Sequence, residues 1–135
     1  MLRVARAAYV SMIGHSYDGL PDEACGLTVG PPGLAVVTAF HRCANAARSS
    51  RIYEIDGKDF LRVDRLADDA DLEINGVVHS HTHTDAYPSP TDVGQAPDPS
   101  WHYVIVSMRD TEPVLRSYRI VDGNIAEEPV VLTGA

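Results

Sequence analysis

A short segment in the middle of the chain places two histidines at the end of a predicted strand. Val77-Val78 runs directly into His79-Ser80-His81, and Asp92 follows after a polar, proline-broken loop. Residues i and i+2 of a strand point to the same face of a sheet, so one ion can contact both imidazoles. Asp92 supplies a third ligand if the loop folds back, and imidazole and carboxylate are ligands that zinc accepts. The segment therefore favours a fold in which a strand end and the following loop close on a metal ion.

Short predicted strands dominate the remaining sequence, together with two main helices. Strands are expected at residues 2–4, 24–29, 34–41, 52–55, 74–81, 103–108, 115–121 and 125–132, the last two forming a hairpin around Asp122-Gly123. A first helix is expected at 6–17 with Ala7, Val10, Ile13 and Tyr17 on its apolar face, and a second at 56–70 with Asp56 as N-cap and Phe60, Val63 and Leu66 on one face. A short helix is expected at 91–95, capped by Ser89 or Thr91. This order predicts a single mixed α/β domain over residues 1–135.

Size and charge narrow the class of protein. The 135 residues match one domain, and 44% of them are hydrophobic, which is enough for a packed core. The net charge of −8 argues against nucleic acid or an anionic membrane as the main partner. No apolar run approaches ~20 residues, and the N-terminus lacks the apolar segment of a signal peptide. Cys25 and Cys43 are too few for a disulfide framework, so we expect reduced thiols in a cytoplasmic protein.

The candidate ligands fit a catalytic zinc site better than a structural one. Catalytic sites typically hold zinc with three protein ligands and leave the fourth position to water or substrate. His79, His81 and Asp92 therefore suffice. His83 continues the alternation and is an alternative fourth ligand, but we expect it at the mouth of the site because the strand pattern ends at Thr82. The other histidines and the cysteines show no ligand spacing, and we interpret them as structural, surface or buried apolar residues: His15, His41, His102, Cys25 and Cys43.

Hydrolysis at zinc also needs a base and a group that stabilises the oxyanion. Ser89 lies three residues before Asp92 and can offer its hydroxyl to the developing negative charge. A serine that merely caps the following turn explains the same position, and the two roles are compatible. Glu23, Glu54 and Glu73 are candidates for the base because they stand at the ends of predicted strands. Glu23 is notable because its charge heads an otherwise apolar strand.

Other metal frameworks fit the sequence less well. The chain has no H-E-x-x-H motif and lacks the H-x-E and P-C-x-x-C elements of zinc deaminases. A TIM barrel with the same histidine pair needs about 250 residues. A cupin-like barrel needs a glutamate soon after the second histidine, whereas none occurs between His81 and Glu112.

The motif resembles the signature of the JAMM (MPN+) zinc metallopeptidases. His79-Ser80-His81, seven further residues and Ser89-Pro90-Thr91-Asp92 match H-S/T-H-x7-S-x-x-D. Glu23, within Glu-Ala-Cys-Gly-Leu, resembles the upstream glutamate of that signature. The resemblance extends from the first helix to the last hairpin. It implies an MPN fold, in which a curved mixed β-sheet or partial barrel is flanked by two main helices.

The resemblance also implies a role for each residue of the motif. His79, His81 and Asp92 bind one Zn²⁺ per chain. Glu23 acts as general base and then as proton donor to the leaving amine, and Ser89 stabilises the tetrahedral intermediate. Many family members have proline after the second histidine, where this chain has Thr82. That departure changes the loop but none of the five functional positions.

Family members cleave amide or isopeptide bonds after the C-terminal tail of ubiquitin-like proteins. With little room for insertions, this chain resembles the compact bacterial branch, of which one member releases cysteine from a ubiquitin-like sulfur carrier protein ending in Gly-Gly. We therefore expect a zinc peptidase acting on such a carrier, whose tail would lie along a strand edge near the zinc. The resemblance suggests Asn45, Arg48 and Tyr53 as contacts of the tail. Processing of another ubiquitin-like precursor or isopeptide, and a non-catalytic MPN binding module, are the alternatives. The oligomeric state is left open, with a homodimer as one option.

Overall fold

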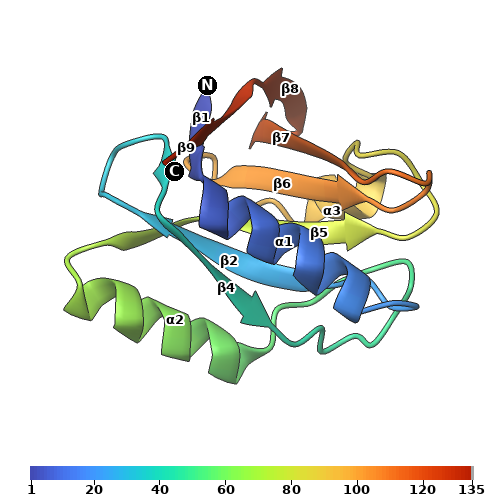
Figure 1. Ribbon diagram of the computed structural model, residues 1–135, viewed down its shortest axis with the longest axis horizontal. Helices are drawn as coiled ribbons and strands as arrows, with labels where there is room; N and C mark the ends of the chain where they lie inside the picture. The colour runs from blue at the N-terminus through green and yellow to red at the C-terminus, as the bar shows by residue number, and fades with distance from the viewer. Residues whose placement is uncertain (135) are drawn as a thin grey trace.

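The computed structural model describes residues 1–134, which form two β-sheets and three helices (Figure 1). The strands are β1 (Leu2–Ala5), β2 (Cys25–Gly30), β3 (Val36–Val37), β4 (Ala39–Cys43), β5 (Glu73–His81), β6 (His102–Ser107), β7 (Val114–Val121), β8 (Asn124–Glu128) and β9 (Val130–Thr133). The helices are α1 (Arg6–Asp18), α2 (Gly57–Asp69) and α3 (Pro90–Gly94). The larger sheet has the order β4-β2-β5-β6-β7-β8, and only its β5–β6 pair is parallel. The expected mixed sheet with two main helices is confirmed, and the sheet does not close into a barrel.

Both faces of the larger sheet are covered, which explains why its central strands are apolar on both sides. Successive residues of β5 point to opposite faces, so Val77 joins the core on the α2 side and Val78 the core on the α1 side. Ile105 and Val104 of β6 divide in the same way. Figure 1 shows α1 crossing in front of the sheet and α2 below it, along the lower edge of the view. The histidines that continue β5 at positions 79 and 81 therefore face the α2 side.

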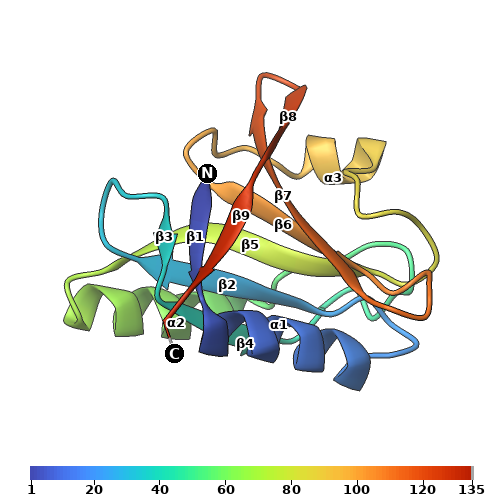
Figure 2. The ribbon, with the colours of Figure 1, turned by 45° about the horizontal axis from the view of Figure 1, so that its top comes forward.

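A smaller sheet brings the two ends of the chain together. β1 is its central strand and pairs in parallel with β3 on one side and with β9 on the other. Figure 2 shows β1 and β9 side by side, with β9 continuing from β8 of the larger sheet. The predicted turn at Asp122-Gly123 is confirmed, with φ values of 51° and 78° at these two residues. The expected strand at 125–132 is wrong in its extent, because it is interrupted at Pro129, so β8 pairs with β7 and β9 joins the small sheet.

The prediction for the first helix was right in extent and wrong in orientation. Its buried residues are Ala8, Met12 and Ser16, whereas Val10 is 61% exposed and Tyr17 45% exposed. Apolar side chains lie all around this helix, so the face that is buried matches the helical repeat as well as the face that was predicted. The Ser16 hydroxyl is accommodated in the core because it donates a hydrogen bond to the Met12 carbonyl, at 2.8 Å.

The second helix follows its prediction more closely. The carboxylate of Asp56 accepts a hydrogen bond from the Asp59 amide, as expected of an N-cap. Val63 is fully buried and Phe60 packs against the same core, but Leu66 is exposed and Ala67 is buried in its place.

Two further strand predictions need correction. The expected strand at 34–41 is interrupted at Thr38, so β3 joins the small sheet and β4 the large one. Residues 52–55 form no strand and make only a single bridge, between Asn45 and Ile55. The Asn45 side chain takes the place of a partner strand, since it donates to the Ile52 carbonyl and accepts from the Glu54 amide, both at 3.0 Å. Asn45, which was expected as a contact of the substrate tail, thus has a structural role in which its side chain holds residues 52–54 in place.

Candidate metal centre

The end of β5 brings two imidazoles together in a buried position. The Nε2 atoms of His79 and His81 lie 3.1 Å apart, and both side chains are almost completely buried. Ser80 between them points to the other face, where its hydroxyl accepts a hydrogen bond from the Ala24 amide at 2.8 Å. Because side chains alternate along the strand, both histidines point to one site, and Ser80 on the other face holds the residue that precedes β2.

The third candidate ligand comes from the first turn of α3. Ser89 is the N-cap of this helix, and its hydroxyl accepts from the Asp92 amide at 3.0 Å. The Asp92 carboxylate accepts in return from the Ser89 amide at 2.9 Å, which completes a capping box. This reciprocal pair directs Asp92 Oδ2 to within 3.1 Å of the His79 Nε2 atom and 2.9 Å of the His81 Nε2 atom. The loop thus folds back as predicted, and Ser89 rather than Thr91 is the cap.

The three candidate ligand atoms lie slightly closer together than the ligands of a tetrahedral zinc ion. Zinc bonds of about 2.0–2.1 Å to nitrogen and oxygen put neighbouring ligand atoms about 3.3 Å apart. The separations here are 2.9 to 3.1 Å. No other group of three such side chains in residues 1–134 converges in this way. The donor set and its spacing fit a zinc ion with one position left for a non-protein ligand.

Neighbouring groups fix the orientation of both rings. His81 Nδ1 donates to the Asp85 carbonyl at 2.6 Å, which leaves the Nε2 lone pair for an ion. The Tyr53 ring stacks on the His79 ring, with centroids 4.2 Å apart and planes 19° from parallel. Neither role was predicted from the sequence, where Tyr53 was expected as a substrate contact. The loop length gave no signal for the Asp85 contact, whereas an aromatic residue beside Ile52 in a predicted strand was a weak signal for burial.

The charges of the site are strongly coupled. Burial alone would raise the pKa of Asp92, but the hydrogen bonds to His79 and His81 outweigh it and hold that pKa well below its usual range. Burial lowers the pKa of His79. His81 is also buried, yet its contacts with Asp92 and the Asp85 carbonyl raise its pKa. Asp92 is therefore an anion and His79 a neutral imidazole, which are the forms that bind a metal ion.

Glu23 lies beside the ligands in a cavity of about 400 Å³, which His81 and Ser89 also line. Its side chain is buried, and its Oε1 atom has no hydrogen-bond partner within residues 1–134. Burial raises the pKa of Glu23 to about 7, and Asp92 adds to this while His81 opposes it. The other two candidates for the base are exposed, and neither lines this cavity. A carboxyl group with a pKa near neutrality can accept and return a proton.

The remaining histidines and cysteines lie outside the metal-binding cluster. His15 Nε2 donates to the Cys25 carbonyl at 2.9 Å, and His102 Nδ1 donates to Glu128 at 2.7 Å, so both are structural. Cys25 and Cys43 are buried thiols that face each other across β2 and β4. Burial raises the pKa of the Cys25 thiol to about 12 and that of Cys43 to about 11, so both stay protonated and unreactive at neutral pH.

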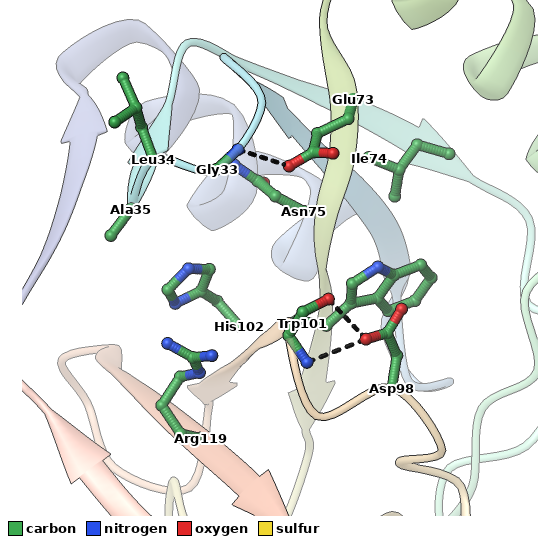
Figure 3. Close-up of a pocket in the computed structure, with 11 residues that line it drawn as sticks. Gly33, Leu34, Ala35, Glu73, Ile74, Asn75, Asp98, Trp101, His102 and Arg119 are labelled. Atoms are coloured by element: carbon green, nitrogen blue, oxygen red, sulfur yellow. Dashed lines mark hydrogen bonds between the residues drawn. The ribbon is translucent and has the colours of Figure 1, made fainter.

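A second cavity, of about 330 Å³, lies at the opposite end of β5. Figure 3 shows Glu73, His102 and Arg119 around it. Glu73 accepts a hydrogen bond from the Gly33 amide and Asp98 one from the Ser100 amide. Glu73, a candidate base by sequence, therefore lies at the end of the strand away from the metal ligands.

Comparison with known proteins agrees with this geometry. The sequence model of a family described as prokaryotic homologues of the JAB domain matches residues 5–121. CysO-cysteine peptidase of Mycobacterium tuberculosis is 47% identical over 129 residues, which cover 94% of this chain and 88% of that protein. Desampylase of Haloferax volcanii is 32% identical over 111 residues, which cover 78% of this chain and 80% of that protein.

Solved structures share the same architecture. The solution structure of a protein from Desulfitobacterium hafniense matches with a TM-score of 0.91 and 28% identity, over 100% of this chain and 94% of that one. A JAB1/MPN domain protein from Archaeoglobus fulgidus matches with a TM-score of 0.64 at 15% identity, over 98% of this chain and 97% of that one. The second match bears on the fold alone, and it confirms the MPN architecture expected from the sequence.

Proposed function

The chain belongs to the prokaryotic JAB domain family, and on this basis we propose that it is a zinc peptidase acting on the C-terminal tail of a ubiquitin-like sulfur carrier protein. It hydrolyses the amide bond after the terminal Gly-Gly of the carrier and releases cysteine. The observation that carries this proposal is the convergence of His79, His81 and Asp92 beside the buried carboxyl group of Glu23. A peptidase named for a carrier–cysteine adduct is 47% identical over nearly the whole chain, which supports the substrate class.

His79, His81 and Asp92 would hold one zinc ion per chain. A bound zinc ion supplies Lewis acidity, which polarises the scissile carbonyl and lowers the pKa of water. The His81–Asp85 contact and the capping box keep the ligand atoms in place, so little reorganisation is needed on binding.

Glu23 moves the proton. Its Oε1 atom has no hydrogen-bond partner among residues 1–134, so it can take a proton from the attacking water and then give it to the leaving amine. Burial, which raises the pKa of this carboxyl group to about 7, suits it to both steps. The Glu23 amide donates to the Ser49 carbonyl at 2.8 Å, and this contact fixes the base relative to the loop at 44–52.

Ser89 stabilises the charge that develops on the carbonyl oxygen. Its Oγ atom accepts the Asp92 amide, whereas its own O–H donates to no acceptor within residues 1–134. A hydroxyl can accept and donate at the same time, so capping α3 leaves its proton available to an oxyanion.

A second substrate class is supported by the relationship to a desampylase, at 32% identity. On this alternative the same residues process a different ubiquitin-like protein or an isopeptide.

No helix within residues 1–134 is long and apolar enough to cross a membrane. We place the enzyme in the cytoplasm because its two buried thiols are unpaired.

The proposal is tested with a carrier protein extended by a single cysteine. The zinc-loaded enzyme should release cysteine, a chelator should stop the release, and added zinc should restore it. His81→Ala should reduce bound zinc well below one equivalent per chain. Cysteine release that is insensitive to the chelator would contradict the metal-dependent mechanism. A panel of carriers with longer extensions separates the two substrate classes, because faster cleavage of a bulky extension favours the alternative.

A further inference from the structure

The cavity beside the candidate metal ligands is lined by one arginine, Arg51, together with Glu23 and Ser89. Ser50, Thr82 and His83 also line it. Arg51 is exposed, and within residues 1–134 its guanidinium takes part in none of the ion pairs. An arginine side chain always carries its charge at neutral pH. The cavity thus combines a reaction site with an unpaired cation, in a protein whose net charge is −8.

The backbone that carries Arg51 is fixed to the reaction site from two directions. The Ser49 carbonyl accepts from the Glu23 amide at 2.8 Å, and the Ser49 hydroxyl accepts from the Arg51 amide at 3.0 Å. The Ser50 carbonyl accepts from the Thr82 hydroxyl at 3.0 Å. The backbone next to Arg51 is therefore hydrogen-bonded both to Glu23, the candidate base, and to Thr82, which directly follows β5 and its candidate metal ligands.

Thr82 also orders the rim of the cavity. Its hydroxyl has a single proton, which it donates to the Ser50 carbonyl, so the 2.7 Å contact with His83 Nδ1 must have the imidazole as donor. Many members of the JAMM family have proline at this position, and proline offers no hydroxyl. Thr82 is thus a positioning residue that links the Arg51 loop to His83 at the mouth of the site.

We propose that Arg51 forms a subsite for the free α-carboxylate of the single amino acid that leaves. This inference rests on the proposed function. In a carrier–cysteine adduct the leaving residue ends in a carboxylate one residue beyond the scissile bond. A longer peptide has a neutral amide at that point. A guanidinium pairs with a carboxylate through two parallel hydrogen bonds. Arg51 would therefore select carriers extended by one residue and disfavour longer extensions.

The test compares two adducts that differ only at this group. One carrier ends in Gly-Gly-Cys with a free carboxylate, and the other ends in the carboxamide of the same cysteine. The wild-type enzyme should prefer the free acid. Arg51→Gln should lower kcat/KM on the free acid about 10- to 100-fold, mainly through KM, because one charge-assisted pair is lost. Its rate on the carboxamide should be unchanged, which also shows that the variant folds and holds zinc.

The matched control is Arg65→Gln. Arg65 is exposed on α2 and does not line the cavity, so its loss should leave the preference intact. Binding gives a second readout that needs no turnover. In the Glu23→Gln background, calorimetry should show tighter binding of the free acid than of the carboxamide, and Arg51→Gln should abolish the difference.

The outcomes separate this inference from the proposed function. If the enzyme cleaves the adduct but Arg51→Gln keeps the full preference for the free acid, the subsite is wrong and the proposed function stands. If Arg65→Gln and Arg51→Gln lose the preference equally, the effect is general electrostatics and the subsite is again wrong. If the wild type neither binds nor cleaves either adduct, the proposed function fails and this inference fails with it.

Discussion

Single residues of the site serve structure and chemistry together, and Ser89 is the clearest case. Ser89→Ala removes both an N-cap and the candidate oxyanion donor. We expect a loss of about 1 kcal/mol in the free energy of unfolding, as for other caps. We also expect a fall of ~10²–10³ in kcat, as for removal of one oxyanion donor. Urea denaturation and steady-state kinetics measure the two effects separately.

Ser89→Thr provides the control for this pair of roles. Threonine keeps a hydroxyl and is a good N-cap, so both stability and turnover should largely recover. A Ser89→Ala enzyme with lowered stability and a nearly unchanged kcat would restrict the residue to capping.

Glu23 is the residue on which catalysis depends most. Glu23→Gln preserves size but cannot accept a proton, so turnover should fall by ~10²–10⁴. The ligand set is untouched, and bound zinc should stay near one equivalent per chain, as measured by metal analysis. Glu54→Gln, at an exposed glutamate outside the cavity, should behave as wild type. Loss of zinc from Glu23→Gln would show that this carboxylate is a ligand rather than the base.

At the scale of elements, the local parts of the site could be predicted and the long-range parts could not. His79 and His81 share a face because of strand alternation, and a capping box places Asp92; both follow from spacing within a short segment. By contrast, the loop that carries Arg51 contacts Thr82 only in the folded chain. The contact is a hydrogen bond from the Thr82 side chain to the Ser50 carbonyl, 32 residues away in the sequence, and no periodicity predicts it.

The orientation of α1 shows a second limit of the sequence. When apolar residues lie all around a helix, several of its faces match the helical repeat of 3.6 residues, and only packing against the sheet decides which face is buried.

The buried face of α1 leads to a direct test. Met12 is 1% exposed, so Met12→Ala should cost about 2–5 kcal/mol in unfolding free energy. Val10 is 61% exposed, so Val10→Ala should stay within about 0.5 kcal/mol of wild type.

Chemical denaturation of the two variants under identical conditions decides between the faces. The face predicted from the sequence requires the opposite ranking, with Val10→Ala the more destabilised protein. Equal losses would mean that α1 is not packed against the sheet as described.

At the scale of the whole molecule, a buried polar cluster lies where the chain leaves the larger sheet for the smaller one. Glu128, the last residue of β8, accepts hydrogen bonds from His102 Nδ1 of β6 at 2.7 Å and from the Ser117 hydroxyl of β7 at 2.9 Å. The chain then passes through Pro129 into β9, which pairs with β1. This cluster could not be predicted from the sequence, because its members come from three strands and no motif connects them.

This cluster predicts how stability depends on pH. Burial alone would raise the pKa of Glu128, but the hydrogen bonds from His102 and Ser117 outweigh it and lower that pKa. A carboxyl group whose pKa is lower in the folded than in the unfolded protein stabilises the fold at pH values above its unfolded pKa, about 4.3. That contribution is lost as the pH falls from this value through the folded pKa. Glu128→Gln should therefore reduce the unfolding free energy at pH 7 by about 1.5–3 kcal/mol, and the difference from wild type should shrink below about pH 4.

Urea denaturation of both proteins from pH 7 to pH 3, with a chelator present throughout, removes any contribution from bound metal. Glu127→Gln is the matched control, since Glu127 is the neighbouring residue and forms only an exposed ion pair with Arg116. That variant should follow the wild-type curve within about 0.5 kcal/mol at every pH. A difference between Glu128→Gln and wild type that stays constant down to pH 3 would mean that the ionised carboxylate is not what holds β8 to the sheet. The loss would then come from altered packing alone.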